Sequence, residues 1–301
     1  MTVSGPRHVP VLYQVTLDSL CIRTDGTYAD CTLGMGGHAE GILRRLGPQG
    51  KLIGFDRDPE ALELATARLN RVREELGSEA AEVRLIGEAF STIAGYVKPG
   101  ELDGLLADFG ASSLHFDEAR RGFSFQADGP LDMRMDTRSG PTAEQVVNEM
   151  DERELANLIY EYGEERRSRT VARAIVRGRP IATTKHLARV VASAVPPIPH
   201  IHPATRTFQA LRIYVNRELE EIKALLEAAP KLLKLSARIA VISFHSLEDR
   251  IAKDSLRDGA KSGIWNIVTK KPVTAGEEEI RKNPRSRSAK LRVAEKAGAR
   301  D

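Results

Sequence analysis

Hydrophobic and polar positions alternate in a regular rhythm along the first hundred residues. Short apolar runs at 28–33, 51–56, 83–86 and 102–108 have the length and composition of buried strands. Helical patterns separate these runs, and one begins at Pro59, whose fixed φ suits the first position of a helix. Strands that alternate with helices predict a parallel sheet with right-handed crossovers.

The rhythm changes after Asp108. Between about 114 and 205 the chain contains no convincing buried strand, and helical patterns occur at 152–161 and 166–176. The segment around Pro196 and Pro197 is typical of a loop or linker. This part of the chain therefore predicts a mostly helical region.

Strand and helix patterns return towards the C-terminus. Apolar positions at helical spacing predict one long amphipathic helix over 211–226. A fifth buried strand is expected at 238–244, and closing strands are expected at 265–268 and 290–294. The chain therefore resumes the architecture with which it begins.

The simplest fold that fits this order is α/β, with a doubly wound, Rossmann-like domain interrupted by an inserted helical domain. We assign residues 1–113 and 206–301 to the α/β domain and residues 114–205 to the insertion. A length of 301 residues suits one large domain with an insertion.

The composition excludes several classes of protein. With 41% hydrophobic and 29% charged residues, the composition is that of an ordinary globular protein. No apolar run approaches the roughly 20 residues of a membrane helix, and residues 1–10 lack the apolar stretch of a signal peptide, so we expect a cytoplasmic protein. Two cysteines cannot build a disulfide framework or a zinc cluster. The histidines at 200, 202 and 245 lack a second acid cluster at ligand spacing, so we expect no metal site.

The net charge of +3 averages over an uneven distribution. Residues 166–217 contain eleven Lys or Arg and no Asp or Glu, and residues 281–301 contain eight basic and two acidic residues. Positive charge gathered in this way indicates polyanion binding, and a set of solvated helix faces is the alternative. Four of the arginines, at 166, 169, 173 and 177, are spaced to share one helix face. Such a row suits contacts with nucleic-acid phosphates, although pairing with nearby glutamates explains it as well.

A glycine-rich turn, Gly34-Met35-Gly36-Gly37-His38, follows the first predicted strand and leads into a helix over 38–46. Glycines allow a tight turn and a close approach of the backbone to a ligand. Asp56 lies twenty residues after Gly36, at the end of the second strand, where a carboxylate can accept both hydroxyls of a ribose. A dinucleotide and S-adenosylmethionine both fit this combination.

Two details favour S-adenosylmethionine. The glycine spacing is not the G-x-G-x-x-G that binds a pyrophosphate, and S-adenosylmethionine has no phosphate. A second strand-end acid, Asp108, follows the fourth strand, and ligands of open α/β sheets bind at the carboxyl ends of strands. A role of Asp108 as a turn or helix-cap residue is the alternative.

Nine longer motifs carry a resemblance to a known family. They are His8–Leu12, Gly36–His38, Phe55–Pro59, Arg121–Phe125, Asp128–Asp136, Tyr162–Arg166, His202–Arg212, Ile242–Arg250 and Asn283–Ser288. Together they resemble the bacterial 16S rRNA (cytosine-N4) methyltransferases, the RsmH (MraW) family, from about residue 8 to residue 295.

The resemblance implies N4-methylation of a P-site cytidine in 16S rRNA, with the small ribosomal subunit as substrate and S-adenosyl-L-methionine as donor. In the family the donor is held by the residues that match Gly36, Gly37, His38, Asp56, Phe90, Asp108 and His115. This chain departs from the family at Cys31, at Leu114-His115 and at Leu235-Ser236-Ala237, where the family has Pro-Gly-Gly. Because two glycines are missing there, we expect a different turn before the fifth strand.

Cytosine N4 is a poor nucleophile because its lone pair is delocalised into the ring. We therefore expect Asp108 and the carbonyls after it to accept hydrogen bonds from the amine, with Ser112 and Ser113 shaping the loop. We assign RNA binding to the insertion, and the residues expected to contact RNA are Arg134, Arg166, Arg169, Arg173, Arg206 and His245.

Other readings stay open at this level. A methyltransferase acting on another RNA and a non-catalytic RNA-binding assembly factor both retain the basic insertion. A nucleotide-dependent oxidoreductase needs the dinucleotide glycine pattern, which this chain lacks. The sequence leaves the oligomeric state open, a homodimer included.

Overall fold

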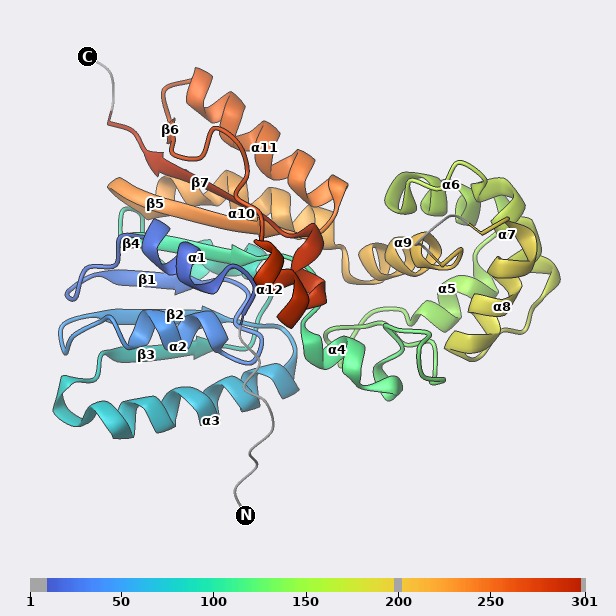
Figure 1. Cartoon of the computed structure of the whole chain (residues 1–301), viewed down its shortest axis with the longest axis horizontal. Helices are drawn as coiled ribbons and strands as arrows, with labels where there is room; N and C mark the ends of the chain where they lie inside the picture. Colours follow the sequence, from blue (N-terminus) through green and yellow to red (C-terminus); the bar gives the residue numbers. More distant parts are fainter. Residues whose placement is uncertain (1–9, 198–201, 299–301) are drawn as a thin grey trace. The chain divides into compact units, whose positions relative to one another are not determined.

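A computed structural model of the chain describes residues 10–197 and 202–298, and it divides into two compact units (Figure 1). The first unit contains residues 1–110 and 219–301, and the second contains residues 111–218. Among the sequence features named above, His8, Val9 and His200 lie outside the described residues. No helix in the described part of the chain is both long and apolar enough to cross a membrane.

The first unit is built on a seven-stranded sheet with the order β3-β2-β1-β4-β5-β7-β6. Its strands are β1 (Thr27–Asp30), β2 (Lys51–Phe55), β3 (Glu82–Ile86), β4 (Leu102–Asp108), β5 (Leu233–Ser243), β6 (Trp265–Ile267) and β7 (Lys290–Lys296). The first five pair in parallel, as predicted. Strand β7 is antiparallel to both β5 and β6, which makes the sheet mixed at that edge.

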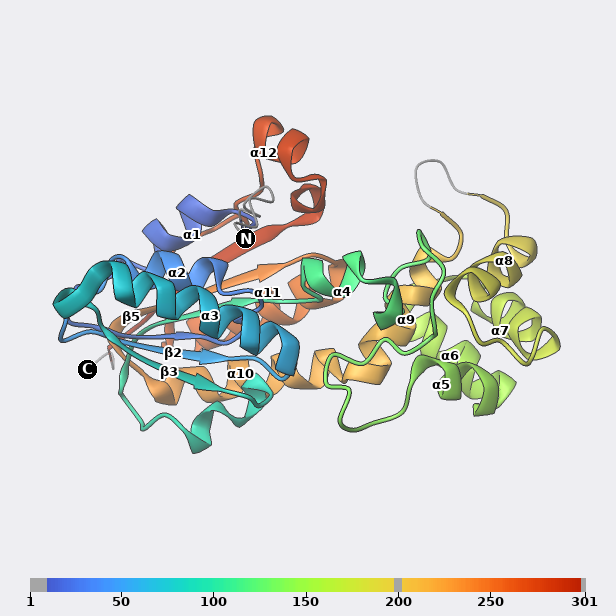
Figure 2. The same cartoon turned by 90° about the horizontal axis from the view of Figure 1, so that it is seen from below.

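Helices cover both faces of this sheet. The helical segments of the unit are α1 (Tyr13–Ser19), α2 (Gly37–Leu43), α3 (Pro59–Leu76), η1 (Gly77–Glu79), η2 (Phe90–Gly95), α10 (Glu218–Leu232), α11 (Ser246–Lys261), α12 (Glu277–Lys282) and η4 (Pro284–Ser288). Apolar residues of α1, α2 and α3 share one core with residues of β2, β4, β5 and β7. Figure 2 shows α1 and α2 on one side of the sheet and α10 on the other. The α/β, doubly wound fold expected from the sequence is therefore present.

The second unit is helical, with α4 (Ser113–Asp117), η3 (Ala119–Arg121), α5 (Ala143–Glu149), α6 (Glu152–Gly163), α7 (Ser168–Arg177), α8 (Thr184–Ala194) and α9 (Thr205–Asn216). Its core is formed by buried residues of α5 to α9, with Leu131 and Met133 from the loop before α5. The buried Asn216 amide holds this loop, since it donates to the Met133 carbonyl at 2.7 Å and accepts from the Met135 N–H at 2.7 Å.

Three local predictions differ from the structure. The first strand ends at Asp30 rather than at Leu33, although the N–H groups of Cys31 and Leu33 still donate to the carbonyls of Leu106 in β4 and Phe55 in β2. The long helix over 211–226 is two helices, α9 and α10, separated by Arg217 in the left-handed region (φ 49°). The fifth strand begins at Leu233 rather than at 238, so Ser236, which has a positive φ of 63° without being glycine, lies inside β5 and not in a turn before it.

The boundaries of the two units differ from those drawn on the sequence. The structure places them after Gly110 and after Glu218, whereas we drew them after residues 113 and 205. Helix α9 lies in the helical unit because its apolar face, which includes Phe208 and Leu211, is buried in the core of that unit. The break at Arg217 coincides with the second boundary to within one residue.

Candidate functional site

The order in which the chain adds strands to the sheet reverses between β1 and β4, which are parallel neighbours in space but are not consecutive in sequence. In open α/β sheets a ligand binds at such a switch point, outside the carboxyl ends of the strands. Three acids stand there in the first unit: Asp30 ends β1, Asp56 follows β2, and Asp108 ends β4. This edge of the sheet is therefore the candidate site.

The glycine turn after β1 is positioned by Asp56. Its carboxylate accepts hydrogen bonds from the N–H of Gly34 at 2.8 Å and from the N–H of Asp58 at 2.9 Å. Gly34 and Gly36 have φ values of 50° and 75°, a region in which a side chain causes strain. The turn and the acid are thus held together before any ligand binds.

Gly37 has a different constraint. A Cβ at this position would lie 2.4 Å from Cγ of Pro10, so only glycine lets the N-terminal segment pack against the start of α2. His38 follows in the first turn of α2, where its ring stacks on Tyr13 with the ring centroids 5.9 Å apart.

Asp30, His38 and Asp108 each hold a buried polar atom that has no hydrogen-bond partner among the described residues. These atoms are Asp30 Oδ2, His38 Nε2 and Asp108 Oδ1. His38 Nδ1 lies 3.7 Å from Asp108 Oδ2. Buried polar atoms are rarely left without partners, so three of them at one strand edge indicate a polar ligand.

Burial also changes the protonation of these groups. Burial, together with the nearby Asp56 carboxylate, raises the pKa of Asp30 to about 7. Burial raises the pKa of Asp108 well above its ordinary value, and the charges of Asp30 and Glu248 add to this effect. Burial lowers the pKa of His38 to about 4, so this imidazole is neutral at pH 7. The site therefore holds several carboxyl groups, and the neutral imidazole of His38 does not offset their negative charge.

Two further contacts shape the edge. Thr32 joins the ends of β1 and β4, because its N–H donates to Asp30 Oδ1 at 3.1 Å and its hydroxyl accepts from the Asp108 N–H at 2.6 Å. Phe90, at the start of η2, is half-buried, and its ring centroid lies 6.2 Å from that of Phe109. An apolar ring is thus present after β3, at a position that the resemblance assigns to donor binding.

The remaining predicted donor and catalytic residues belong to the second unit. Ser112 caps α4, and Ser113 is its first residue. His115 is buried, accepts a hydrogen bond from the Ser112 N–H through Nδ1 at 3.0 Å, and stacks on Phe123 at 4.7 Å. The His115 ring therefore already takes part in the capping of its own helix.

The predicted arginine row is shorter than expected. Arg166 is exposed but precedes α7, because the helix begins at Ser168. Arg169, Arg173 and Arg177 lie on α7 at four-residue intervals and are exposed. Arg173 approaches Glu152 to 3.5 Å, an exposed pair of small energetic weight.

The other predicted RNA contacts have internal partners. Arg134 makes a two-pronged pair with Asp132 at 2.8 and 2.9 Å. Arg206 donates to the carbonyl of Glu164 at 3.1 Å and lies 3.7 Å from Glu165. His245, in the first unit, caps α11 by accepting from the Glu248 N–H at 3.4 Å. These three side chains have structural roles, and their contact with RNA stays a prediction.

Comparisons with known proteins place the sequence in a family. The model of the MraW methylase family matches residues 5–297. The chain belongs to this family. A protein named ribosomal RNA small subunit methyltransferase H from Acidobacterium capsulatum is 65% identical over 292 residues, which cover 96% of this chain and 98% of that one.

Two further proteins with the same name are similar over nearly their whole length. The one from Koribacter versatilis is 57% identical and covers 95% of this chain and 93% of its own. The one from Sorangium cellulosum is 48% identical and covers 98% and 92%, respectively. This MraW-family chain is therefore an S-adenosylmethionine-dependent methyltransferase, as its sequence motifs implied.

The residues at the switch point fit this cofactor. Its sulfonium is a cation, and the edge offers the carboxyls of Asp30, Asp56 and Asp108. The atoms without partners on Asp30, His38 and Asp108 are buried acceptors or donors of the kind that a polar ligand satisfies.

Three members of this edge were missed by the reading of the sequence: Asp30, Thr32 and Glu248. The strand-end signal that selected Asp56 and Asp108 applies equally to Asp30, but the first strand was drawn three residues too long. Glu248 is fully buried, and its Oε2 accepts from the N–H groups of Phe244 and His245 at 2.7 and 3.2 Å. Nothing in its helical spacing distinguishes it from a solvated glutamate.

Proposed function

We propose that this MraW-family protein transfers a methyl group from S-adenosylmethionine to the exocyclic N4 of a P-site cytidine in 16S rRNA of the small ribosomal subunit. The observation that carries the proposal is the group of buried, partnerless atoms of Asp30, His38 and Asp108 at the switch point. The curated relatives are named as small-subunit rRNA methyltransferases, which supports the RNA part. A ribosomal substrate of this kind places the enzyme in the cytoplasm.

We assign donor binding to Gly36, Gly37, His38, Asp56, Phe90, Asp108 and His115. The positive φ of Gly36 brings the backbone of the turn to the ligand, and the Asp56 carboxylate, which the Gly34 N–H holds against this turn, is the acceptor that we assign to the ribose hydroxyls. Phe90 offers an apolar face to adenine. Among these residues His115 is the most constrained, because its Nδ1 already accepts a hydrogen bond in the cap of α4.

We assign the chemistry to Asp108. When bound, S-adenosylmethionine supplies an electrophilic methyl group on its sulfonium. The Asp108 Oδ1 atom has no partner among the described residues, so it can accept a hydrogen bond from an amine. A raised pKa brings this carboxyl closer to the working pH, which suits a group that takes a proton as the amine is methylated. Ser112 and Ser113 follow four and five residues later and begin α4, and we assign them to the shape of this loop.

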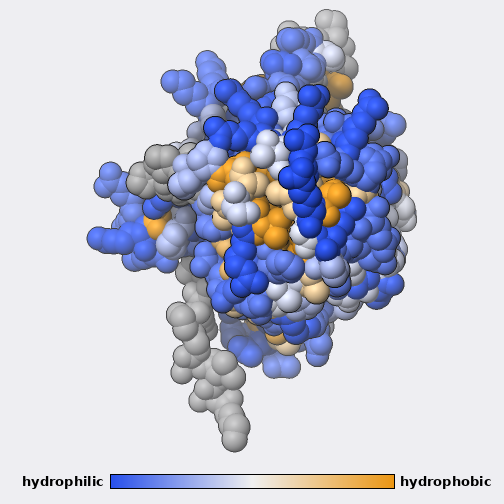
Figure 3. Space-filling view, turned by 90° about the vertical axis from the view of Figure 1, so that its right-hand side faces the viewer, coloured by the Kyte–Doolittle hydropathy of each residue, from blue (hydrophilic) through white to orange (hydrophobic). Residues whose placement is uncertain are grey.

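We assign RNA binding to the helical unit, in particular to Arg166 and to the exposed row on α7. Guanidinium groups contact phosphates without reading sequence, and this positions the RNA. Figure 3, which looks onto this unit, shows strongly hydrophilic side chains around a patch of apolar residues. We also assign RNA contacts to Arg134, Arg206 and His245. Each of these side chains must give up an internal hydrogen-bond partner to contact RNA. A looped or single-stranded cytidine reaches the donor at a low free-energy cost, because its base need not leave a duplex stack.

The test of the function is mass spectrometry of nucleosides from small-subunit rRNA incubated with the protein and S-adenosylmethionine. We expect N4-methylcytidine with the natural protein. The Asp108→Asn variant should lower single-turnover methyl transfer at saturating donor by roughly 100-fold or more, as loss of a general base does. Normal transfer by this variant would remove Asp108 from the chemistry, and absence of product with the natural protein would favour a non-catalytic assembly factor.

The RNA assignment has a separate test. Arg169→Glu combined with Arg173→Glu should weaken binding of small-subunit rRNA and reduce the slope of affinity against salt, because two phosphate contacts are lost. The matched control is Arg71→Glu with Arg73→Glu, which makes the same charge change at two exposed positions of α3. Equal effects of the two double variants would show that only net charge matters and would contradict the assignment.

A further inference from the structure

Asp30 is a buried acid with no cationic partner among the described residues. The residue is 1% exposed, and its Oδ1 accepts a hydrogen bond from the Thr32 N–H at 3.1 Å. The N–H groups of Thr32 and Ala39 lower the pKa of this carboxyl, but burial has the larger effect and raises it. Oδ2 has no hydrogen-bond partner among the described residues. An ionised carboxylate in such a place is costly, so either a proton or a cationic ligand must compensate it.

The charged groups that face Asp30 and Asp108 come from every neighbouring element. Asp56 after β2 acts on Asp30, and Asp30 acts on Asp108 across the β1–β4 pair. Glu248 of α11 also acts on Asp108. His38 of α2 lies 3.7 Å from Asp108 and is neutral above about pH 4.

The two aspartates are also mechanically joined. Thr32 binds Asp30 through its N–H and the Asp108 backbone through its hydroxyl. This link is indirect, because Thr32 contacts the carboxyl of Asp30 but only the backbone of Asp108. The charge of Asp30 also raises the pKa of Asp108, and two carboxyls that interact in this way do not both ionise readily.

We propose that the Asp30–Asp108 pair keeps a proton when the donor is absent, releases it to solvent when the sulfonium of S-adenosylmethionine binds, and retains it when the neutral product S-adenosylhomocysteine binds. The inference rests on the proposed placement of the donor at this edge. Its consequence is a proton-linked preference for donor over product: donor affinity rises with pH, whereas product affinity changes little. Release of S-adenosylhomocysteine is then favoured, because this product lacks the positive sulfonium charge that displaced the proton when the donor bound.

The size of the effect follows from linkage. The raised pKa of Asp30, about 7, means that the carboxyl is roughly half protonated in the free protein at pH 7. For each proton released, donor affinity should rise roughly tenfold per pH unit below that value and level off above it. The window from pH 5.5 to 8.5 avoids the titration of His38, whose pKa is about 4.

The experiment is isothermal titration calorimetry of the full chain with S-adenosylmethionine and with S-adenosylhomocysteine. Titrations at pH 7 in phosphate and in Tris, which differ in ionisation enthalpy, give the number of protons released. We expect roughly half a proton or more released with S-adenosylmethionine and less with S-adenosylhomocysteine. The Asp30→Asn variant should bind the donor with markedly less release. Because the ligand amino group contributes equally in both proteins, the difference between them belongs to Asp30.

Two controls make the outcome decisive. Asp25→Asn removes an exposed acid from the loop before β1, at the other end of the sheet, and should leave the proton release unchanged. If the Asp30→Asn variant fails to fold, the pH dependence of the two affinities in the natural protein still decides the matter. Donor binding with equal proton release for both ligands overturns the inference and leaves the proposed function intact, whereas no binding of either ligand overturns both.

Discussion

Strand β4 carries Asp103 near its first residue and Asp108 as its last, and the two carboxyls have opposite surroundings. Asp103 is buried, accepts from the Thr27 N–H at 2.9 Å and pairs with Lys234 at 2.6 Å and Arg23 at 3.5 Å. Asp108 shares its end of the sheet with Asp30, and the charges that act on it are those of other carboxyls. Cations therefore compensate the buried acid at the Asp103 end of the sheet, whereas the charges that act on the buried acid at the Asp108 end are negative.

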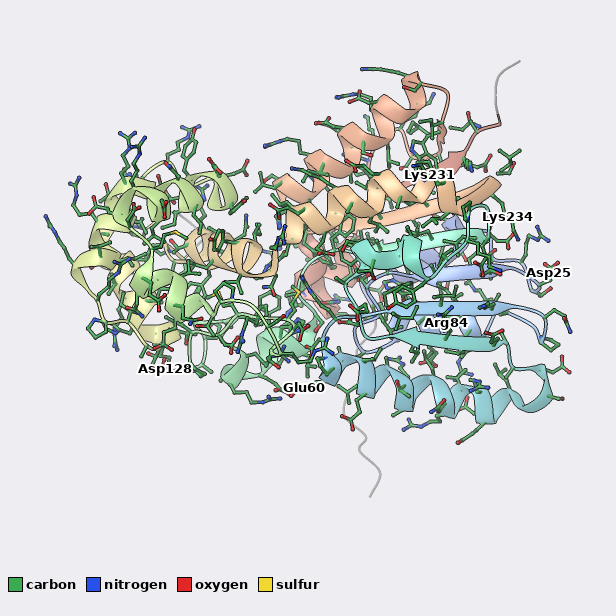
Figure 4. All side chains as sticks on the ribbon, turned by 180° about the vertical axis from the view of Figure 1, so that it is seen from behind. Asp25, Glu60, Arg84, Asp128, Lys231 and Lys234 are labelled. Carbon is green, nitrogen blue, oxygen red and sulfur yellow. The ribbon has the colours of Figure 1, made fainter. Side chains whose placement is uncertain are left out.

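Figure 4 locates the two ends of the sheet, since Lys234 and Asp25 are labelled at one end and Glu60, in the first turn of α3, at the other. Stability favours the arrangement at Asp103, where cations and a backbone donor offset the burial of a charge. No cation among the described residues acts on Asp30 or Asp108. Under the proposed function, the sulfonium of the donor supplies the positive charge at this end of the sheet.

The largest stability effect should come from Asp30→Asn. Because the pKa of Asp30 in the folded protein, about 7, exceeds the ordinary 3.8, the contribution of this group is fully present below about pH 4 and is lost as the pH rises through about 7. The difference corresponds to up to roughly 4 kcal/mol. In urea unfolding at pH 8, Asp30→Asn should therefore be more stable than the natural protein by a few kcal/mol.

The natural protein alone cannot isolate this effect. The lowered pKa of His38 removes stability as the pH falls from 6.5 towards 4, which opposes the trend of Asp30. The quantity to measure is the difference between variant and natural protein, since His38 is common to both. That difference should shrink towards pH 4, and a difference independent of pH would mean that Asp30 is not destabilised by burial.

Asp103→Ala should act in the opposite direction. It leaves the Thr27 N–H without its acceptor and Lys234 without its partner, so we expect a loss of about 1–3 kcal/mol. Lys234 is partly exposed, which keeps the loss below that of a fully buried pair. Asp103→Asn retains an acceptor oxygen and should recover part of the stability. A stabilising Asp103→Ala would erase the contrast between the two edges.

The smallest effect is expected for Asp25→Asn. The Arg23–Asp25 pair is exposed on both sides, so solvent screens it. Thermal unfolding of this variant should coincide with that of the natural protein within experimental error. A clear shift of Tm would indicate that Arg23 depends on Asp25 to reach Asp103, and the group of charges around Asp103 would then include a second acid.

Much of the fold follows from local patterns. Helix α3 begins at Pro59 as predicted, with Asp58 as its cap, because capping and a fixed φ act within a few residues. The helices at 152–161 and in the α7 segment are present, with shifts of one or two residues at most of their ends. The break at Arg217 was not predictable from apolar spacing, since 211–226 reads as one continuous amphipathic face. It depends on Asn216, whose side chain binds the backbone of residues 133 and 135, more than eighty positions away.

The sequence by itself determined that Asp56 and Asp108 stand at the ends of strands, and with the glycine turn and the family motifs it determined the methyltransferase family and the cofactor class. It did not place the end of the first strand at Asp30. Strand ends are readable because an apolar run must stop where the chain leaves the core. Only the tertiary structure decided how each charge is compensated: Asp103 by Lys234, Arg134 by Asp132, and Asp30 by no cation among the described residues. The cost of a buried charge depends on what surrounds it in space, and the spacing of residues along the chain does not contain that information.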